Sequence, residues 1–289
     1  MKLDIDLLVD WKNILVNELK MAGYAPDQGV GVEDISFQYY YIKKREIVVS
    51  PRKVLRSDVF GCPADLMVGL SKFESEVTSG KNLNPYLSRG LRNLDYDDLL
   101  LNDWGIYHFH LGEKIESDGF VNRTGPLLFA RVSDDTAYLI NIFKHGGWSK
   151  KELIEIVHRN WPQSIEHYKV KGILGMASEI NDDDHAQLRK SGISTFVEMS
   201  DGVIYGMLGG GYAMDGSSIE ARTYSDRMLN LLVEIEEHAK NNVEEIARLV
   251  LENSSEEPSI ISLNLDIDGD KIYLFEKSTN IRLLMYDGS

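Results

Sequence analysis

The chain has 289 residues, 43% hydrophobic and 27% charged, which are the proportions of an ordinary soluble globular protein. Its net charge of −15 is opposite to that of proteins that coat nucleic acid through phosphate contacts. The sequence has no apolar run of membrane-spanning length, a single cysteine excludes an internal disulfide, and we expect no signal peptide because the N-terminal residues lack the basic and apolar pattern of one. We therefore expect a cytoplasmic protein with no membrane segment.

The first predicted elements are a helix and a β-hairpin. Apolar residues spaced by three and four predict an amphipathic helix over residues 3–22. Alternating apolar and aromatic residues then predict a hairpin over residues 35–49. The basic residues Lys43, Lys44 and Arg45 would lie in the turn of this hairpin.

Two helices followed by three strands are predicted next. Helical spacing covers residues 63–80, and a second, shorter helix is expected over 84–91. Residues 100–112 have the composition of a buried strand. Two further strands, 127–132 and 136–144, flank a polar turn and form a hairpin.

The remaining chain again mixes helices and hairpins. A helix begins at Ser149 as N-cap, and another is expected over residues 182–191. Hairpins are predicted within residues 195–208 and 260–276, and between them lies a long amphipathic helix at 225–252.

These elements predict the α+β class, with antiparallel sheets packed against helices. Two domains are expected, an α+β domain over residues 1–172 and a second α+β domain of hairpins and a long helix over 173–289. The apolar stripe of the helix at 225–252 could also form a homodimer contact.

Two histidines one residue apart are the most distinctive feature of the predicted strand at 100–112. Alternate residues of a strand share a face, so His108 and His110 should point to the same side, together with Trp104. His145 ends a neighbouring predicted strand. Arg131 and Lys144 lie on the adjacent strands, so all five polar side chains could meet on one sheet face.

This cluster is compatible with three kinds of chemistry. Two histidines can act as base and acid on RNA, while Arg131 and Lys144 stabilise the charge on phosphorus, with no cofactor. Alternatively, His108, His110 and His145 could bind a divalent metal ion that activates water. The third interpretation is a hydrogen-bonded pair of histidines with a purely structural role.

The segment from residue 60 to 148 resembles the RelE-type toxins of the barnase/RelE class. The resemblance rests on two helices, Asp103-Trp104-Gly105-Ile106-Tyr107-His108, the strands that follow, and a terminal Lys144-His145. It implies a RelE-like core and a metal-independent endoribonuclease. Arg131 stands where the family tends to carry a strand arginine, and Lys144 or His145 where it tends to carry a terminal basic residue. The chain also resembles bacterial proteins with a similar His-Phe-His-Leu-Gly strand.

The sequence thus predicts a toxin-like endoribonuclease that acts on RNA or the ribosome through His108, His110, His145, Arg131 and Lys144. Arg123, Lys43, Lys44 and Arg45 are the expected substrate-binding residues. The first alternative is a non-catalytic acidic binding or anti-defence protein that docks a basic partner. The second is a metal-dependent hydrolase with histidine ligands.

Overall fold

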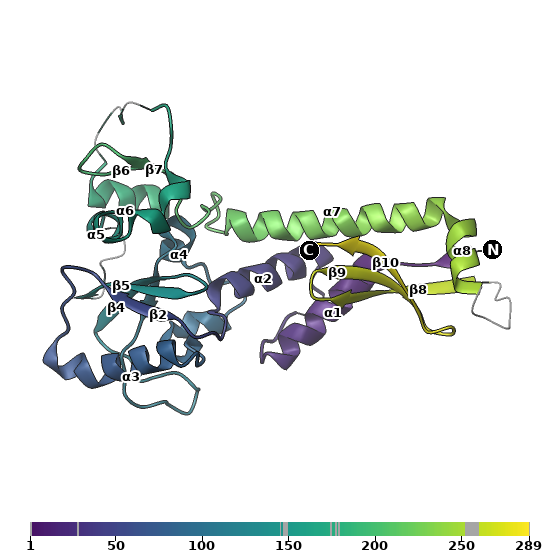
Figure 1. Cartoon of the computed structure of the whole chain (residues 1–289), viewed down its shortest axis with the longest axis horizontal. Coiled ribbons are helices and arrows are strands. Elements are labelled where there is room, and N and C mark those ends of the chain that lie inside the picture. Colours follow the sequence, from purple (N-terminus) through teal and green to yellow (C-terminus); the bar gives the residue numbers. More distant parts are fainter. Residues whose placement is uncertain are drawn as a thin grey trace. The chain divides into compact units, whose positions relative to one another are not determined.

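The computed structural model describes residues 2–27, 29–144, 146, 150–173, 175–176, 178, 180–251 and 260–288. The chain forms two compact units, shown in Figure 1: unit 1 comprises Met1–Tyr40 and Thr223–Ser289, and unit 2 comprises Tyr41–Arg222. The predicted α+β class is confirmed. The domain boundary expected at residue 172 lies inside unit 2, because the N-terminal strand pairs with a strand close to the C-terminus.

A mixed four-stranded sheet forms the centre of unit 2. Its order is β2 (Lys53–Arg56), β5 (Thr136–Lys144), β4 (Pro126–Val132), β3 (Tyr107–Phe109). The predicted β4–β5 hairpin is confirmed. The expectation of a purely antiparallel sheet is wrong at one edge, where β2 runs parallel to β5.

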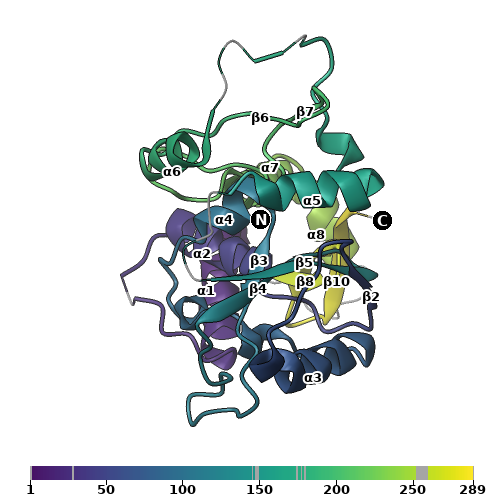
Figure 2. The same ribbon diagram turned by 90° about the vertical axis from the view of Figure 1, so that its left-hand side faces the viewer.

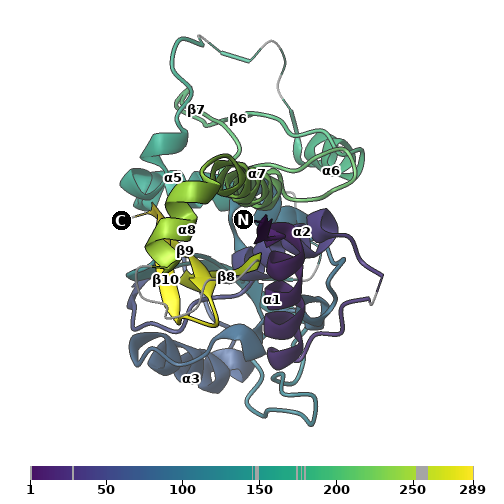
Figure 3. The same ribbon diagram turned by 90° about the vertical axis from the view of Figure 1, so that its right-hand side faces the viewer.

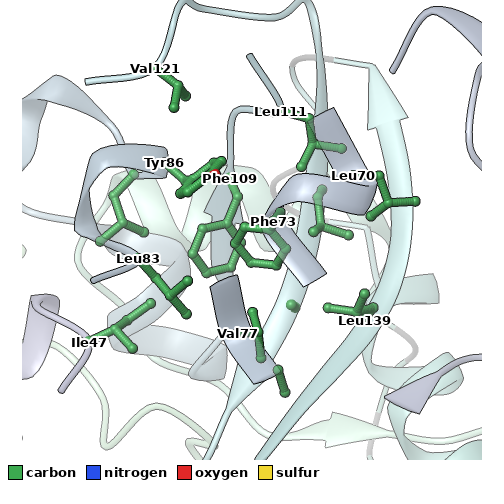
Figure 4. Close-up of a cluster of buried hydrophobic side chains, with 14 of the residues drawn as sticks. Ile47, Leu70, Phe73, Val77, Leu83, Tyr86, Phe109, Leu111, Val121 and Leu139 are labelled. Atoms are coloured by element: carbon green, nitrogen blue, oxygen red, sulfur yellow. The ribbon is translucent and has the colours of Figure 1, made fainter. Parts of the chain in front are cut away.

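Helices cover both faces of this sheet, with α3 (Met67–Thr78) and α5 (Glu152–Asn160) on opposite sides (Figure 2). On the α3 side, Phe73 packs against Phe109 with ring centroids 4.8 Å apart (Figure 4). Successive residues of β4 alternate between the two cores, so Leu128 contributes to the α3 side and Phe129 to the α5 side. The sheet is therefore buried on both faces.

Short elements complete unit 2. They are the 3-10 turns η1 (Ala64–Leu66), η2 (Asn84–Tyr86), η3 (Arg89–Arg92), η4 (Pro162–Ser164) and η5 (Glu166–Tyr168), the helices α4 (Leu99–Trp104) and α6 (Asp182–Lys190), and the strands β6 (Val197–Glu198) and β7 (Ile204–Tyr205). The helix predicted at 84–91 is present only as η2 and η3, because Pro85 and Gly90 disfavour a continuous helix. Helix α6 begins at Asp182, as predicted, and the structure adds a capping box between Asn181 and Asp184 at this end.

Unit 1 is built around a second four-stranded sheet, of order β1 (Lys2–Asp4), β8 (Ile260–Asp268), β9 (Lys271–Glu276), β10 (Ile281–Asp287). Its helices are α1 (Leu7–Met21), α8 (Val243–Leu251) and the greater part of α2 (Val32–Arg45) and of α7 (Ile219–Asn241), which Figure 3 shows from this side. The last turn of α2 and the first turn of α7 belong to unit 2. The buried side chains Ile261, Leu263 and Leu265 alternate along β8, as expected for a strand with one face in the core.

Three sequence-based expectations are corrected by these elements. Residues 35–49 do not form a hairpin: Ile35 and Ile42, seven residues apart, are both buried, which is the period of helix α2. The strand expected over 100–112 is shortened to β3, because Asp98 caps α4 and Gly105 ends it with a φ of 64°. The helix predicted at 225–252 is divided into α7 and α8.

Helix α7, although 23 residues long, carries charged side chains along its length. No helix within the part of the chain that the structure describes is both long and apolar enough to cross a membrane.

Candidate functional site

A cavity of about 610 Å³ lies in unit 2, beside the strand that carries the two histidines. Four segments contribute its polar side chains: the loop that leads into α4, the end of β3, the segment before β4, and the C-terminal turn of α6. The aliphatic part of its wall includes Leu99, Leu100 and Leu127. The cavity therefore combines an apolar wall with a few convergent polar groups, as ligand sites commonly do.

His108 and His110 both line this cavity. His108 lies in β3 and His110 follows it directly, with exposed fractions of 8% and 4%. Trp104, which was expected on the same strand face, ends α4 and lies in the hydrophobic core instead. Both imidazoles thus lie in the cavity wall, while the indole does not.

Asp98 lies next to His108. Its Oδ2 atom is 3.7 Å from Nδ1 of His108, and its Oδ1 atom accepts a hydrogen bond of 3.1 Å from the backbone N–H of Leu101. The cap of α4 therefore fixes the carboxylate in place. The carboxylate lies close to the imidazole of His108, where it can stabilise a positive charge on the ring.

His110 is held by the backbone of Thr124. Its Nδ1 atom lies 3.2 Å from the N–H of Thr124 and 3.3 Å from the carbonyl oxygen of the same residue. The neutral ring can accept from the N–H, and the protonated ring can donate to the oxygen. His110 can thus keep its position in either protonation state, which suits a group that transfers a proton.

Three basic residues line the same cavity: Arg123, Arg189 and Lys190. Arg123 and Lys190 are exposed, whereas Arg189 is 6% exposed. Arg189 makes two hydrogen bonds of 2.9 and 2.7 Å to Oδ2 of Asp103 and lies 4.4 Å above the ring of Trp104. This buried ion pair joins α6 to α4 and fixes the wall of the cavity.

Two further residues of the α4 loop contribute ionisable groups. Burial raises the pKa of the Asp97 carboxyl, and burial also raises the pKa of the Tyr96 hydroxyl to about 12. Asp97 and Asp98 face the same cavity as the basic residues. The wall therefore carries both signs of charge.

Arg131, predicted to be catalytic, has a different position. Its Nη1 donates a hydrogen bond of 2.7 Å to the carbonyl oxygen of Trp104, and its guanidinium lies 5.9 Å from the ring of Tyr168. Burial lowers the pKa of Arg131. The side chain does not line the cavity, and its contacts indicate that it holds the end of α4.

The other predicted residues are distributed as follows. Lys144 is exposed at the end of β5 and does not line the cavity. His145 lies outside the described residues, as does Ser149, whereas Gly146 is part of the cavity wall. Of the expected substrate-binding residues, only Arg123 is at the cavity.

The basic run Lys43, Lys44 and Arg45 occupies the last turn of α2. Lys44 donates to the carbonyl oxygen of Gly209 at 2.5 Å and forms an ion pair of 2.9 Å with Glu220. Arg45 donates to two backbone carbonyl oxygens, one of them that of Tyr96 at 2.7 Å. Lys44 and Arg45 are therefore engaged within unit 2, and Arg45 supports the loop that lines the cavity.

Sequence reasoning missed four charged residues of the wall: Asp97, Asp98, Arg189 and Lys190. The first two precede a helix that was predicted as strand, so their role as cap and neighbour of His108 was hidden. Arg189 and Lys190 are about 80 residues from the histidines in the sequence, and no spacing pattern connects them.

A metal centre was the alternative for the histidines. Among the described residues, which do not include His145, no group of three His, Cys, Asp or Glu side chains is arranged to hold a metal ion.

Comparisons with protein-family models, with curated proteins and with solved structures gave no match to this chain.

Proposed function

We propose that unit 2 is a metal-independent endoribonuclease that cleaves RNA in this cavity by acid/base catalysis, the activity that the resemblance to RelE-type toxins implies. One observation carries the proposal: His108 and His110 line the same cavity as Arg123, Arg189 and Lys190. Two proton-transfer groups beside cations are what the cleavage of a phosphodiester requires.

The surroundings of the two histidines suggest which one acts as the base and which one as the acid. His108, with the carboxylate of Asp98 beside it, removes the proton from the RNA 2′-hydroxyl. The 2′-oxygen then forms a bond to phosphorus while the bond from phosphorus to the 5′-oxygen breaks. His110 donates a proton to the departing 5′-oxygen, which leaves a 2′,3′-cyclic phosphate and a 5′-hydroxyl. Arg123 and Lys190 stabilise the additional negative charge on the phosphoryl oxygens.

The cavity and the order of elements support the proposal further. Its volume of about 610 Å³ is within the usual range for small-ligand sites, roughly 300–1,000 Å³, and is large enough for a nucleotide. The succession of β3, β4 and β5 along the chain agrees with the strands on which the RelE-like resemblance rests, whereas the second helix of that resemblance, expected at 84–91, is replaced by η2 and η3.

The test is cleavage of a fluorescent single-stranded RNA by the purified full chain in the presence of EDTA. We expect a 2′,3′-cyclic phosphate product and a rate loss of about 10²- to 10⁴-fold for His108→Ala and for His110→Ala. His167→Ala is the matched control, because His167 is an exposed histidine outside the cavity wall.

Three results would refute the proposal. Unchanged cleavage by both cavity variants would remove the histidines from the reaction. Cleavage that occurs only with an added divalent ion would favour the metal-dependent hydrolase. The absence of any cleavage, together with salt-sensitive binding to a basic protein, would favour the acidic binding protein.

A further inference from the structure

The negative charge of the chain is concentrated in unit 1. This unit contains 21 Asp and Glu against nine Lys and Arg, a net charge of −12, whereas unit 2 contains 25 against 22, a net charge of −3. Most of the charge of −15 therefore belongs to the unit without the candidate site. Such an excess attracts basic partners and accelerates their association.

Strand β10 is an edge of the sheet in unit 1. Among the described residues it pairs with β9 on one side, and no strand is paired with its other side. Leu284 and Tyr286 of this strand have exposed fractions of 52% and 43%. Natural edge strands are commonly shielded by charged side chains, prolines, bulges or a covering element. Strand β10 has Arg282, Asp287 and an irregular pairing between Leu284 and Tyr286, but it contains neither lysine nor proline.

A groove of about 670 Å³ is lined by residues of β10 and of the helices α7 and α8. Its apolar lining includes Leu231, Leu249, Leu283 and Met285. Leu283 is paired in register with Leu274 of β9, which is fully buried. The groove therefore continues the hydrophobic core of unit 1 to the open edge of the sheet.

The charged residues of the groove are unequal in number. Glu234 and Glu245 line it and are exposed, together with His238. Arg282 also lines it, but its Nε is 2.6 Å from Oδ2 of Asp266 and its guanidinium stacks 4.1 Å from the ring of Tyr273. The positive charge of Arg282 is thus paired with Asp266, and the exposed carboxylates of Glu234 and Glu245 make the rim of the groove acidic beside its apolar lining.

We propose that β10 and this groove bind an extended, basic segment of a partner protein as an additional strand. The backbone of the segment would pair with the open edge of β10, its apolar side chains would enter the groove, and its Lys or Arg side chains would face Glu234 and Glu245. Strand addition with alternate side chains in pockets is a recurrent mode of peptide recognition. A second copy of this chain is a poorer occupant, because it would bring another unit with a charge of −12 to the same place.

The test uses synthetic ten-residue peptides in which lysine alternates with valine, and the full chain. We expect the peptide to bind, and Glu245→Lys to weaken the binding about tenfold through the loss of one attraction and the gain of one repulsion. Glu244→Lys is the matched control: Glu244 is the neighbouring exposed residue on α8, but it does not line the groove.

Two N-methylated peptides distinguish strand addition from general attraction between opposite charges. One is methylated on the odd and one on the even amides, so that only one of them loses the N–H groups that would pair with β10. We expect one to bind like the parent and the other to lose binding. Four results would overturn the proposal. The first is a parent peptide that does not bind, and the second is equal binding of both methylated peptides. The third is an equal effect of Glu244→Lys and Glu245→Lys, and the fourth is pairing of β10 with a second copy of the chain instead of the peptide.

Discussion

At the scale of the residue, Asp97 lines the cavity and, in its charged form, lowers the stability of the folded chain. Burial is the main cause that raises the pKa of its carboxyl above 3.8, and the neighbouring Asp215 raises it further. The folded chain therefore holds this proton more tightly than the unfolded chain does. The free energy of unfolding falls as the pH rises from the pKa of Asp97 in the unfolded chain to its pKa in the folded chain. The full loss of stability is therefore present at neutral pH.

We therefore predict that Asp97→Asn increases the free energy of unfolding at pH 7, and that this gain is absent at pH 3. The measurement is urea unfolding of both proteins across this range. Asp134→Asn, an exchange at an exposed position in the turn between β4 and β5, is the control. A gain that is the same at both pH values would show that the charge of Asp97 is not its cause.

The residues of the site differ in how far their positions could be foreseen. The alternation of a strand was enough to place His108 and His110 on one wall, because β3 and the residue after it are extended there. The role of Arg131 could not be foreseen, because its partner is a backbone carbonyl at the end of a helix that was predicted as strand. Local pattern thus locates neighbours along a strand, whereas contacts between distant segments depend on the folded chain.

At the scale of the element, α3 packs very closely against the chain segment that follows the two histidines. A Cβ atom at Gly69 of α3 would lie 1.9 Å from the carbonyl oxygen of Leu111, so no larger side chain fits unless the helix moves. Leu111 directly follows His110, so a shift of α3 should also displace the wall of the cavity.

We predict that Gly69→Ala destabilises the protein by about 2–3 kcal/mol through this overpacking, although alanine is intrinsically the better helix former. Unfolding in urea measures the effect. Gly61→Ala is the control, because a Cβ there has no neighbour within 4 Å and should change stability by less than about 0.5 kcal/mol. A neutral or stabilising Gly69→Ala would show that α3 adjusts without cost.

Helix α2 explains why some elements could not be predicted. Its alternating Ile35, Phe37, Tyr39 and Tyr41 fit a strand as well as a helix, and aromatic residues favour strands. Burial decides between the two, since Ile35 and Ile42 enter the core while Phe37 and Tyr39 are half-buried. Where the two patterns did not compete, as in α3, α6 and the β4–β5 hairpin, the predictions are confirmed. The helix predicted at 3–22 is confirmed from Leu7 onward, after the strand β1.

At the scale of the whole molecule, the uneven division of charge should make the two units respond differently to salt. Unit 1 has a net charge of −12 and unit 2 of −3, so repulsion between like charges is mainly a cost to unit 1. Raising NaCl from about 0.1 M to about 1 M shortens the screening length from about 10 Å to about 3 Å, which removes much of this repulsion.

We predict that this increase in salt slows hydrogen–deuterium exchange in β8, β9 and β10 by about threefold to tenfold, equivalent to roughly 1 kcal/mol, and slows exchange in β4 and β5 less. Mass spectrometry of peptides from each strand gives both readings in one experiment, so unit 2 serves as the internal reference. An uncharged osmolyte such as sucrose should protect both units alike, because it acts through exclusion from the protein surface. If NaCl also slows both units equally, burial of apolar surface rather than charge repulsion limits the stability of unit 1. The acidic residues would then be available for binding a basic partner at no cost to the fold.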